Sequence, residues 1–285
     1  MIDIPKFLVI GASGYLGSAL LAVARRGHPD AMGLTSRSVP LEAPDLSVVG
    51  VDDMGYEWGV IAAEVSDPAR WAAEPEAVRK CNVDGTLSLA RQLAEMDIRP
   101  LWFSSDQVFD GRESSYGDDA PTSPVNEYGR QKAEVEARFT EASLGMGLVV
   151  RLSVVYDTVP GSGTLLDAMM GNLRSGGIER AASGICLSPT HIDDVAACLL
   201  HLMRAKTTGV VNVTAESISH LDLARLAAEA AGVGEDRVQP VDVADLDAPF
   251  LRPLGGVVLA PSPRLDGYKF LDVREALTRL AAATR

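Results

Sequence analysis

The fold of this chain is decided by the stretch Phe7-Leu8-Val9-Ile10-Gly11-Ala12-Ser13-Gly14-Tyr15-Leu16-Gly17, in which four apolar residues lead into three glycines spaced three apart. Helix-forming residues follow as far as Ala24, so the pattern predicts a buried strand, a tight turn and the start of a helix. The backbone N–H groups of such a turn and the helix dipole together favour a bound phosphate. We expect Gly11 to allow the turn, Gly14 to let a pyrophosphate approach the backbone, and Gly17 to let helix and strand pack closely.

The glycine turn therefore predicts a dinucleotide site, to which Ser13, Tyr15 and Leu16 also belong. Its spacing is G-x-x-G-x-x-G, which differs from the commoner G-x-G-x-x-G, and an ordinary turn of an α/β protein stays the alternative. A secretory leader is a second alternative for this apolar start. We reject it because Asp3 offsets the charge of Lys6 and because the glycines interrupt the apolar run.

The composition predicts a globular, cytoplasmic protein. The chain has 285 residues, enough for one large domain or two small ones, and 47% of them are hydrophobic and 23% charged. The formal net charge of -13 argues against a nucleic-acid partner. No apolar run approaches the roughly 18 residues that a membrane span needs. The three cysteines form no Cys-x-x-Cys pair, so we expect neither a disulfide framework nor a metal site.

The residues after the second predicted strand, at 31–35, bear on the choice of cofactor. In a dinucleotide fold an acid at this point binds the ribose of NAD, whereas an arginine suits the 2′-phosphate of NADP. The chain has Thr35-Ser36-Arg37-Ser38 here, without an acid. We therefore expect Ser36 and Arg37 to bind NADP(H), with NAD(H) as the alternative cofactor and a solvated loop as the alternative role for Arg37.

Strands and helices alternate along the first 156 residues. Further strands are predicted at 46–51, 59–63, 102–105 and 147–152, and helices at 68–96 and 126–142. This alternation predicts an α/β fold with a doubly wound parallel (Rossmann) sheet. We expect residues 1–156 to form the dinucleotide-binding domain, with Ala62 and Ala63 against the cofactor. Residues 157–285, including a proline-rich loop at 240–263, are expected to form a small substrate lobe with some segments returning to the Rossmann core.

The segment Tyr128-Gly129-Arg130-Gln131-Lys132 places a phenol and an amine four residues apart, on one face of the predicted helix. Reduction of a ketone needs a proton on oxygen, but the ordinary pKa of tyrosine, about 10, is high for this task. A neighbouring ammonium favours the phenolate, so Tyr128 is expected to act as the acid and base, and Lys132 also to hold the nicotinamide ribose. Ser105, at the end of a predicted strand, is expected to hydrogen-bond the carbonyl. An exposed helix and a strand cap are the structural alternatives.

With these residues in view, the chain resembles the extended short-chain dehydrogenases/reductases, and most of all the dTDP-4-dehydrorhamnose reductases. The resemblance covers nearly the whole chain, and its most specific part is the run Ser104-Ser105-Asp106-Gln107-Val108-Phe109-Asp110-Gly111. Its other parts are the glycine turn, Asn82-Val83-Asp84-Gly85-Thr86, the segment 126–132 and, more weakly, Arg151-Leu152-Ser153 and Arg264-Leu265-Asp266.

The resemblance implies that NADPH or NADH reduces a 4-keto nucleotide sugar. It also implies that Asn82 lies near the cofactor and active site, and that Asp106 lies near the substrate or the catalytic tyrosine. Val154 and Arg264 are expected on the substrate side. Val154 stands where such reductases tend to carry an aromatic residue associated with the sugar, so the substrate is less well indicated than the fold.

The sequence therefore predicts an NADP(H)-dependent reductase of a keto group on a nucleotide-linked sugar or a similar small metabolite. A sugar-nucleotide epimerase or dehydrogenase with a tightly held cofactor is one alternative. A non-catalytic dinucleotide-binding regulatory subunit is the other. Neither a nucleic acid nor a membrane is expected as a partner, and the oligomeric state is open, a homodimer included.

Overall fold

The computed structural model describes residues 4–245 and 256–283, and these form two compact units. The first unit consists of Met1–Ser105, Tyr128–Arg151 and Ala196–Val211. The second consists of Asp106–Glu127, Leu152–Val195 and Asn212–Arg285. Each unit is therefore assembled from three stretches of chain.

A six-stranded sheet forms the centre of the first unit. The strand order is β10-β5-β4-β3-β1-β2, and β1 pairs in parallel with β2 and β3, as β3 does with β4. All residues of β1 and β3 are buried, as expected for a parallel sheet covered on both faces. The strands are β1 (Phe7–Ile10), β2 (Gly33–Leu34), β3 (Trp58–Ile61), β4 (Arg99–Ser105), β5 (Leu148–Leu152) and β10 (Gly209–Asn212).

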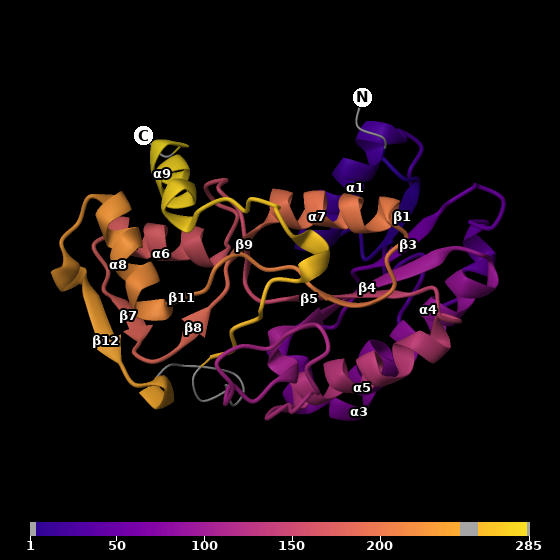
Figure 1. Ribbon diagram of the computed structural model, residues 1–285, viewed down its shortest axis with the longest axis horizontal. Coiled ribbons are helices and arrows are strands. Elements are labelled where there is room, and N and C mark those ends of the chain that lie inside the picture. Colours follow the sequence, from indigo (N-terminus) through magenta and orange to yellow (C-terminus); the bar gives the residue numbers. More distant parts are fainter. Residues whose placement is uncertain (1–3, 246–255, 284–285) are drawn as a thin grey trace. The chain divides into compact units, whose positions relative to one another are not determined.

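Helices cover both faces of this sheet. In Figure 1, α1 and α7 lie on one side of it, and α3, α4 and α5 lie on the other. The apolar core on the second side includes Leu89, Leu93 and a stacked pair, Trp102 and Phe139, whose ring centroids are 5.9 Å apart. The helices are α1 (Tyr15–Gly27), α2 (Pro68–Ala73), α3 (Pro75–Arg79), α4 (Thr86–Glu95), α5 (Glu127–Ala142) and α7 (Ile192–Arg204), with a π-helical turn, η2 (Lys80–Gly85), before α4.

Two expectations for the first unit need correction. The run 46–51 is not a strand, because Ser47–Val49 forms a 3₁₀ turn (η1). Its apolar ends, Leu46 and Val51, are buried in the core, and the N–H of Leu46 donates to the side chain of Gln92 at 2.8 Å, so no sheet pairing is needed. The helical run 68–96 is also not one helix, because Pro75 begins a new helix at its first turn.

The described residues of the second unit form short paired strands and the helices α6, α8 and α9. Here α8 packs between α6 and α9, and a side-chain cap from Ser219 begins α8 while Gly232, at φ 74°, ends it. The helices are α6 (Leu165–Arg174), α8 (His220–Ala231) and α9 (Val273–Ala283). The strand pairs are β7 (Glu179–Ala182) with β12 (Val238–Val241), β8 (Cys186–Leu187) with β11 (Ile218–Ser219), and β6 (Val155–Tyr156) with β9 (Thr190–His191).

The proline-rich segment is loop only in part. Strand β12 includes Pro240, and Val243–Asp245 and Pro263–Leu265 form 3₁₀ turns (η5 and η6). Residues 246–255 of the expected loop lie outside the described residues. No helix in the described ranges combines the length and apolarity that crossing a bilayer requires.

Candidate active site

The glycine turn joins β1 to α1 as its sequence predicts. Gly11 has φ 92°, and a side chain there would collide with the backbone of Ala63, which follows β3. A side chain at Gly17 would collide with the carbonyl oxygen of Gly11, so the first turn of α1 packs directly on the end of β1. At Gly14 a side chain would meet only that same oxygen, at 3.4 Å. The turn thus has close internal contacts at its two ends and open space at its middle glycine.

The N-terminus of α1 fits an anionic group. Gly14 is its N-cap, no described side chain caps it, and its first turn carries no acid. The backbone N–H groups and the positive end of the helix dipole are therefore available to a phosphate. Ser13 and Tyr15 are exposed beside this N-terminus and Leu16 is partly buried. These features fit the pyrophosphate of a dinucleotide.

The end of β2 meets the glycine turn at the same edge of the sheet. The N–H groups of Gly11 and Ala12 both donate to the carbonyl of Leu34, at 2.8 and 3.0 Å. The next residues form a turn in which Thr35 N–H donates to the hydroxyl of Ser38. Ser36 and Arg37 are exposed in this turn.

Tyr128 and Lys132 share one face of α5, because residues four apart in a helix stand above one another. The Lys132 ammonium is buried, donates to the carbonyl of Phe103 at 2.8 Å, and lies 5.5 Å from the centroid of the Tyr128 ring. It also lies 4.7 Å from the Trp102 ring. Phe103 and Trp102 belong to β4, the strand that ends at Ser105, so the sheet itself fixes the lysine.

A small cavity of about 10 Å³, room for about one water molecule, lies beside these two side chains. Four predicted site residues line this cavity: Ala63, Asn82, Tyr128 and Lys132. The remaining lining residues are Glu64, Trp71, Thr86, Trp102 and Gln131. Ser105 is buried at the end of β4, and Ala62 is partly buried at the end of β3.

Asn82 is held by the backbone of the segment after β3. Its amide oxygen accepts from the N–H of Val65 at 2.8 Å, and its amide nitrogen donates to the carbonyl of Val65 at 3.1 Å. Trp71 donates to that same carbonyl at 2.9 Å and packs edge-on against Tyr128, with ring centroids 5.6 Å apart. Asn82 thereby orders the chain beside the cavity.

Sequence reasoning missed Glu64 and Trp71. The carboxylate of Glu64 lies 3.2 Å from the ammonium of Lys132. A signal for Glu64 was present, because it directly follows Ala62 and Ala63 at the carboxyl end of a parallel strand, where ligands bind in such folds. No comparable signal singled out Trp71, which is brought to Tyr128 by the turn between β3 and α2.

The predicted substrate residues Asp106, Val154 and Arg264 belong to the second unit. Within it, the Asp106 carboxylate accepts a hydrogen bond of 2.6 Å from the hydroxyl of Ser153. Val154 is partly buried, and its carbonyl accepts from the N–H of Thr190. Arg264 is about half exposed and pairs with Asp118 at 3.5 Å. Asp106 and Arg264 are thus already engaged with neighbours of their own unit.

The end of the Ser104–Gly111 run is held in place by contacts with Tyr116. Tyr116 donates to the carboxylate of Asp110 at 2.6 Å, which holds the pKa of Asp110 below its usual value. Burial, and then the same carboxylate, raise the pKa of Tyr116. Phe109 stacks on Tyr116 with centroids 4.1 Å apart. In the described part of the chain, no group of three His, Cys, Asp or Glu side chains is arranged to hold a metal ion.

Comparison with known proteins gives a consistent picture. A family model described as the RmlD substrate binding domain matches residues 5–284. The chain is 31% identical over 262 residues to a dTDP-4-dehydrorhamnose reductase of Mycobacterium tuberculosis, which covers 87% of this chain and 82% of that protein. It is 27% identical over 209 residues to methionine adenosyltransferase 2 subunit beta of Bos taurus, covering 68% of this chain and 61% of that protein.

Among solved structures, a dTDP-4-dehydrorhamnose reductase of Bacillus anthracis, determined in complex with NADP, has a TM-score of 0.83 to this chain. The match covers 97% of this chain and 99% of that chain at 21% sequence identity. It confirms the predicted fold class, an α/β protein with a doubly wound parallel sheet.

Proposed function

Because this chain belongs to the family of the RmlD substrate binding domain, and is an oxidoreductase of the extended short-chain dehydrogenase/reductase class, we propose that it reduces the 4-keto group of a nucleotide-linked sugar with NADPH. The observation that carries this proposal is the pairing of Tyr128 with a buried Lys132 on α5, beside the strand that ends at Ser105. The relatives named as reductases of dTDP-4-dehydro sugars support the choice of substrate class.

The proposed cofactor site is the glycine turn with the turn that follows β2. Its support is the uncapped N-terminus of α1, the open space at Gly14, and the exposed Arg37 at the same sheet edge, where a 2′-phosphate would bind. The NADP complex of a protein with the same fold agrees with this choice. NAD(H) stays the alternative.

In the proposed mechanism each side chain has one task. The reduced nicotinamide, when bound, supplies the hydride to the carbonyl carbon. Ser105 donates a hydrogen bond to the carbonyl oxygen and fixes its position. Tyr128 transfers its phenolic proton to that oxygen, and Lys132 stabilises the phenolate that results and binds the nicotinamide ribose. Asn82 is proposed to bind the cofactor, and Asp106, Val154 and Arg264 are proposed to bind the substrate.

The test is turnover followed by the absorbance of NADPH with a panel of 4-keto nucleotide sugars. We expect Tyr128→Phe and Lys132→Met each to lower kcat about 10²–10⁴-fold while the NADPH affinity of Tyr128→Phe stays within a factor of a few. Glu134→Gln, a change on the same helix outside the cavity lining, is the matched control and should keep wild-type turnover. Wild-type protein that binds NADPH but turns over no member of the panel would contradict the proposal.

A non-catalytic role is the second candidate, since the chain is also similar to a protein named as a subunit, methionine adenosyltransferase 2 subunit beta. In that role the cofactor would be bound and not consumed. A cellular phenotype that survives Tyr128→Phe but is lost with Gly14→Val would favour it. Loss of the phenotype with both variants favours the reductase.

A further inference from the structure

The carboxylate of Glu64 is an acidic group placed directly against the lysine of the candidate site. Its Oε1 atom lies 3.2 Å from Lys132 Nζ and is shielded from solvent, whereas the Glu64 side chain as a whole is 24% exposed. Among the described residues Oε1 accepts no hydrogen bond of good geometry, so its contact with Lys132 is an ion pair with acceptor capacity left over. Removing one carboxylate oxygen from water is unfavourable unless an opposite charge compensates it, and the Lys132 ammonium is placed to do so.

The other groups around Lys132 are a backbone carbonyl and two aromatic rings. Its ammonium donates to the carbonyl of Phe103, and the rings of Trp102 and Tyr128 flank it. Of the described residues lining the cavity, Glu64 on the β3 side and Tyr128 and Lys132 on α5 are the titratable ones. The other elements at the cavity contribute Trp71 from α2, Asn82 from η2, Thr86 from α4 and Trp102 from β4, none of which titrates.

The sign of each effect on Tyr128 follows from charge alone. An ammonium near the phenol favours the phenolate, and a carboxylate near it disfavours the phenolate. A ketone reductase needs the phenol protonated at the start of each turnover, because this proton goes to the carbonyl oxygen. A carboxylate that offsets part of the lysine's charge therefore suits the direction of reduction.

We propose that Glu64 is a positioning residue that fixes the Lys132 ammonium against β4 and raises the proton affinity of Tyr128, so that the phenol stays protonated at neutral pH. The proposal rests on the proposed function in one respect, the role of Tyr128 as proton donor. Glu64 lies 3.2 Å from the Lys132 ammonium, which in turn lies 5.5 Å from the centre of the Tyr128 ring. At the effective dielectric of a partly buried site, removing one charge at a separation of this order shifts the pKa of the phenol by about one unit.

The primary test needs neither cofactor nor substrate. Full-length protein labelled with ¹³C at the tyrosine ring carbon bearing the hydroxyl is titrated by NMR, and Tyr128→Phe assigns the signal among the six tyrosines. We expect Glu64→Gln to move the Tyr128 titration to lower pH by about one unit. Glu134→Gln removes the same charge from α5, outside the cavity lining, where Glu134 binds Arg79, and should leave the titration unchanged. An unchanged Tyr128 titration in folded Glu64→Gln overturns the proposal.

A second variant guards against loss of the fold. Glu64→Asp keeps the negative charge but moves it one methylene group away from Lys132. It should therefore move the Tyr128 titration to lower pH by a smaller amount than Glu64→Gln does. An unchanged Tyr128 titration in Glu64→Asp, or one moved to higher pH, counts against the proposal. In the enzyme assay, the alkaline limb of kcat for reduction should move to lower pH in Glu64→Gln. A shifted titration in a protein without turnover refutes the proposed function and leaves this inference standing, whereas an unchanged titration in an active enzyme refutes this inference alone.

Discussion

Single glycines in the first turn of the nucleotide site have separable roles. At Gly14 an added methyl group has only one neighbour, at 3.4 Å, and the backbone (φ -76°, ψ 166°) suits any residue. At Gly17 the same methyl group collides with the carbonyl of Gly11. We therefore expect Gly14→Ala to fold with wild-type stability and to weaken NADPH binding at least tenfold, because the methyl group occupies the space proposed for the pyrophosphate.

Gly17→Ala is the matched comparison for that prediction. It should lower the melting temperature as well as the affinity, since the start of α1 has to move away from β1. Calorimetric melting and fluorescence titration with NADPH separate the two effects. Unchanged NADPH affinity in a well-folded Gly14→Ala would show that the dinucleotide does not bind across this glycine.

The bond between Tyr116 and Asp110 predicts an acid dependence of stability. The pKa of Asp110 is lowered in the folded protein, chiefly by the Tyr116 hydroxyl, so its contribution is complete above the unfolded pKa of about 4. That contribution is lost as the pH falls through the lowered pKa. Tyr116→Phe removes the hydroxyl, and its free energy of unfolding should depend less on pH below about 4 than that of wild type. Urea unfolding of both proteins across this range checks the prediction, and parallel pH profiles would contradict it.

At the scale of single residues, the sequence could predict which side chains lie close together where a motif fixes their spacing. Tyr128 and Lys132 could be paired because helical spacing alone puts them on one face, and the structure brings Asn82 and Ala63 to the same cavity. Glu64 and Trp71 could not be assigned, since their places depend on how the chain turns after β3, and that turn is ordered by the bonds between Asn82 and Val65. Such a long-range contact leaves no local pattern.

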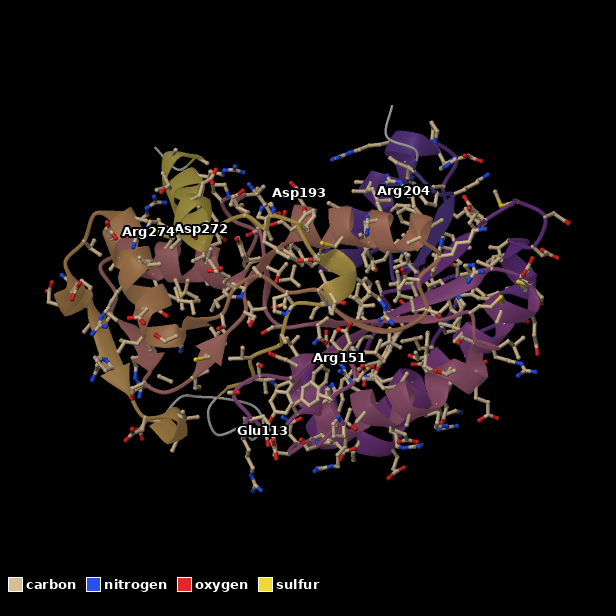
Figure 2. The ribbon with its side chains drawn as sticks, viewed as in Figure 1. Glu113, Arg151, Asp193, Arg204, Asp272 and Arg274 are labelled. Atoms are coloured by element: carbon tan, nitrogen blue, oxygen red, sulfur yellow. The ribbon has the colours of Figure 1, made fainter. Side chains whose placement is uncertain are left out.

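Between elements, a buried ion pair ties β5 to α5. Arg151 binds Glu136 through two hydrogen bonds of 2.9 and 2.7 Å, and the two side chains are 3% and 5% exposed. Arg151 projects into the interior, whereas the other labelled side chains, such as Glu113 and Arg274, lie at the surface (Figure 2). The pair therefore joins a strand to a helix where water cannot replace either partner.

We expect Glu136→Gln to lower the free energy of unfolding by about 3–5 kcal/mol, because the Arg151 charge is then buried without its counterion. Glu134→Gln, which removes a partly exposed pair with Arg79 two residues earlier on the same helix, should cost less than about 1 kcal/mol. Chemical denaturation of the two variants measures the difference. Equal losses would mean that burial does not set the strength of this contact.

Whole elements were predictable where hydrophobic periodicity and a terminator agreed. The helix at 126–142 and the strand at 147–152 match α5 and β5 within one residue. The strand predicted at 46–51 was wrong, because a short apolar stretch has the same sequence pattern whether it pairs in a sheet or packs as a turn. There, tertiary packing around the side chain of Gln92 decided the outcome.

In the whole molecule, one boundary in the sequence does not separate the two units, because each unit contains three separate stretches of the chain. The first unit takes its last stretch, Ala196–Val211, from beyond residue 156, and this stretch supplies most of α7 and the edge strand β10. The sequence predicted that some segments after residue 156 return to the Rossmann core, but local patterns did not identify which ones, because that depends on which helix finally covers the sheet. Leu199, Leu202 and Met203 of α7 are buried.

A fragment of residues 1–156 should accordingly fail to form a native first unit. Without α7 and β10, the apolar sheet face that α7 covers is left in water, and we expect a compact state that binds hydrophobic dyes and unfolds without cooperativity. Circular dichroism and dye fluorescence, with the full chain as control, test this. A fragment that melts cooperatively and binds NADPH would contradict the prediction.

The π-helical turn at Lys80–Gly85 has a consequence for how the chain can change over time. It holds one more residue per turn than the helices on either side, and the side chain of Asn82 projects from it. Loss of one residue from this stretch would let it close into an ordinary α-helical turn, so the apolar side of α4 would keep its place against the sheet while the position of Asn82 changed. A one-residue deletion here should therefore disturb the packing of α4 less than the same deletion within α4, although it would remove the bonds that Asn82 makes to Val65.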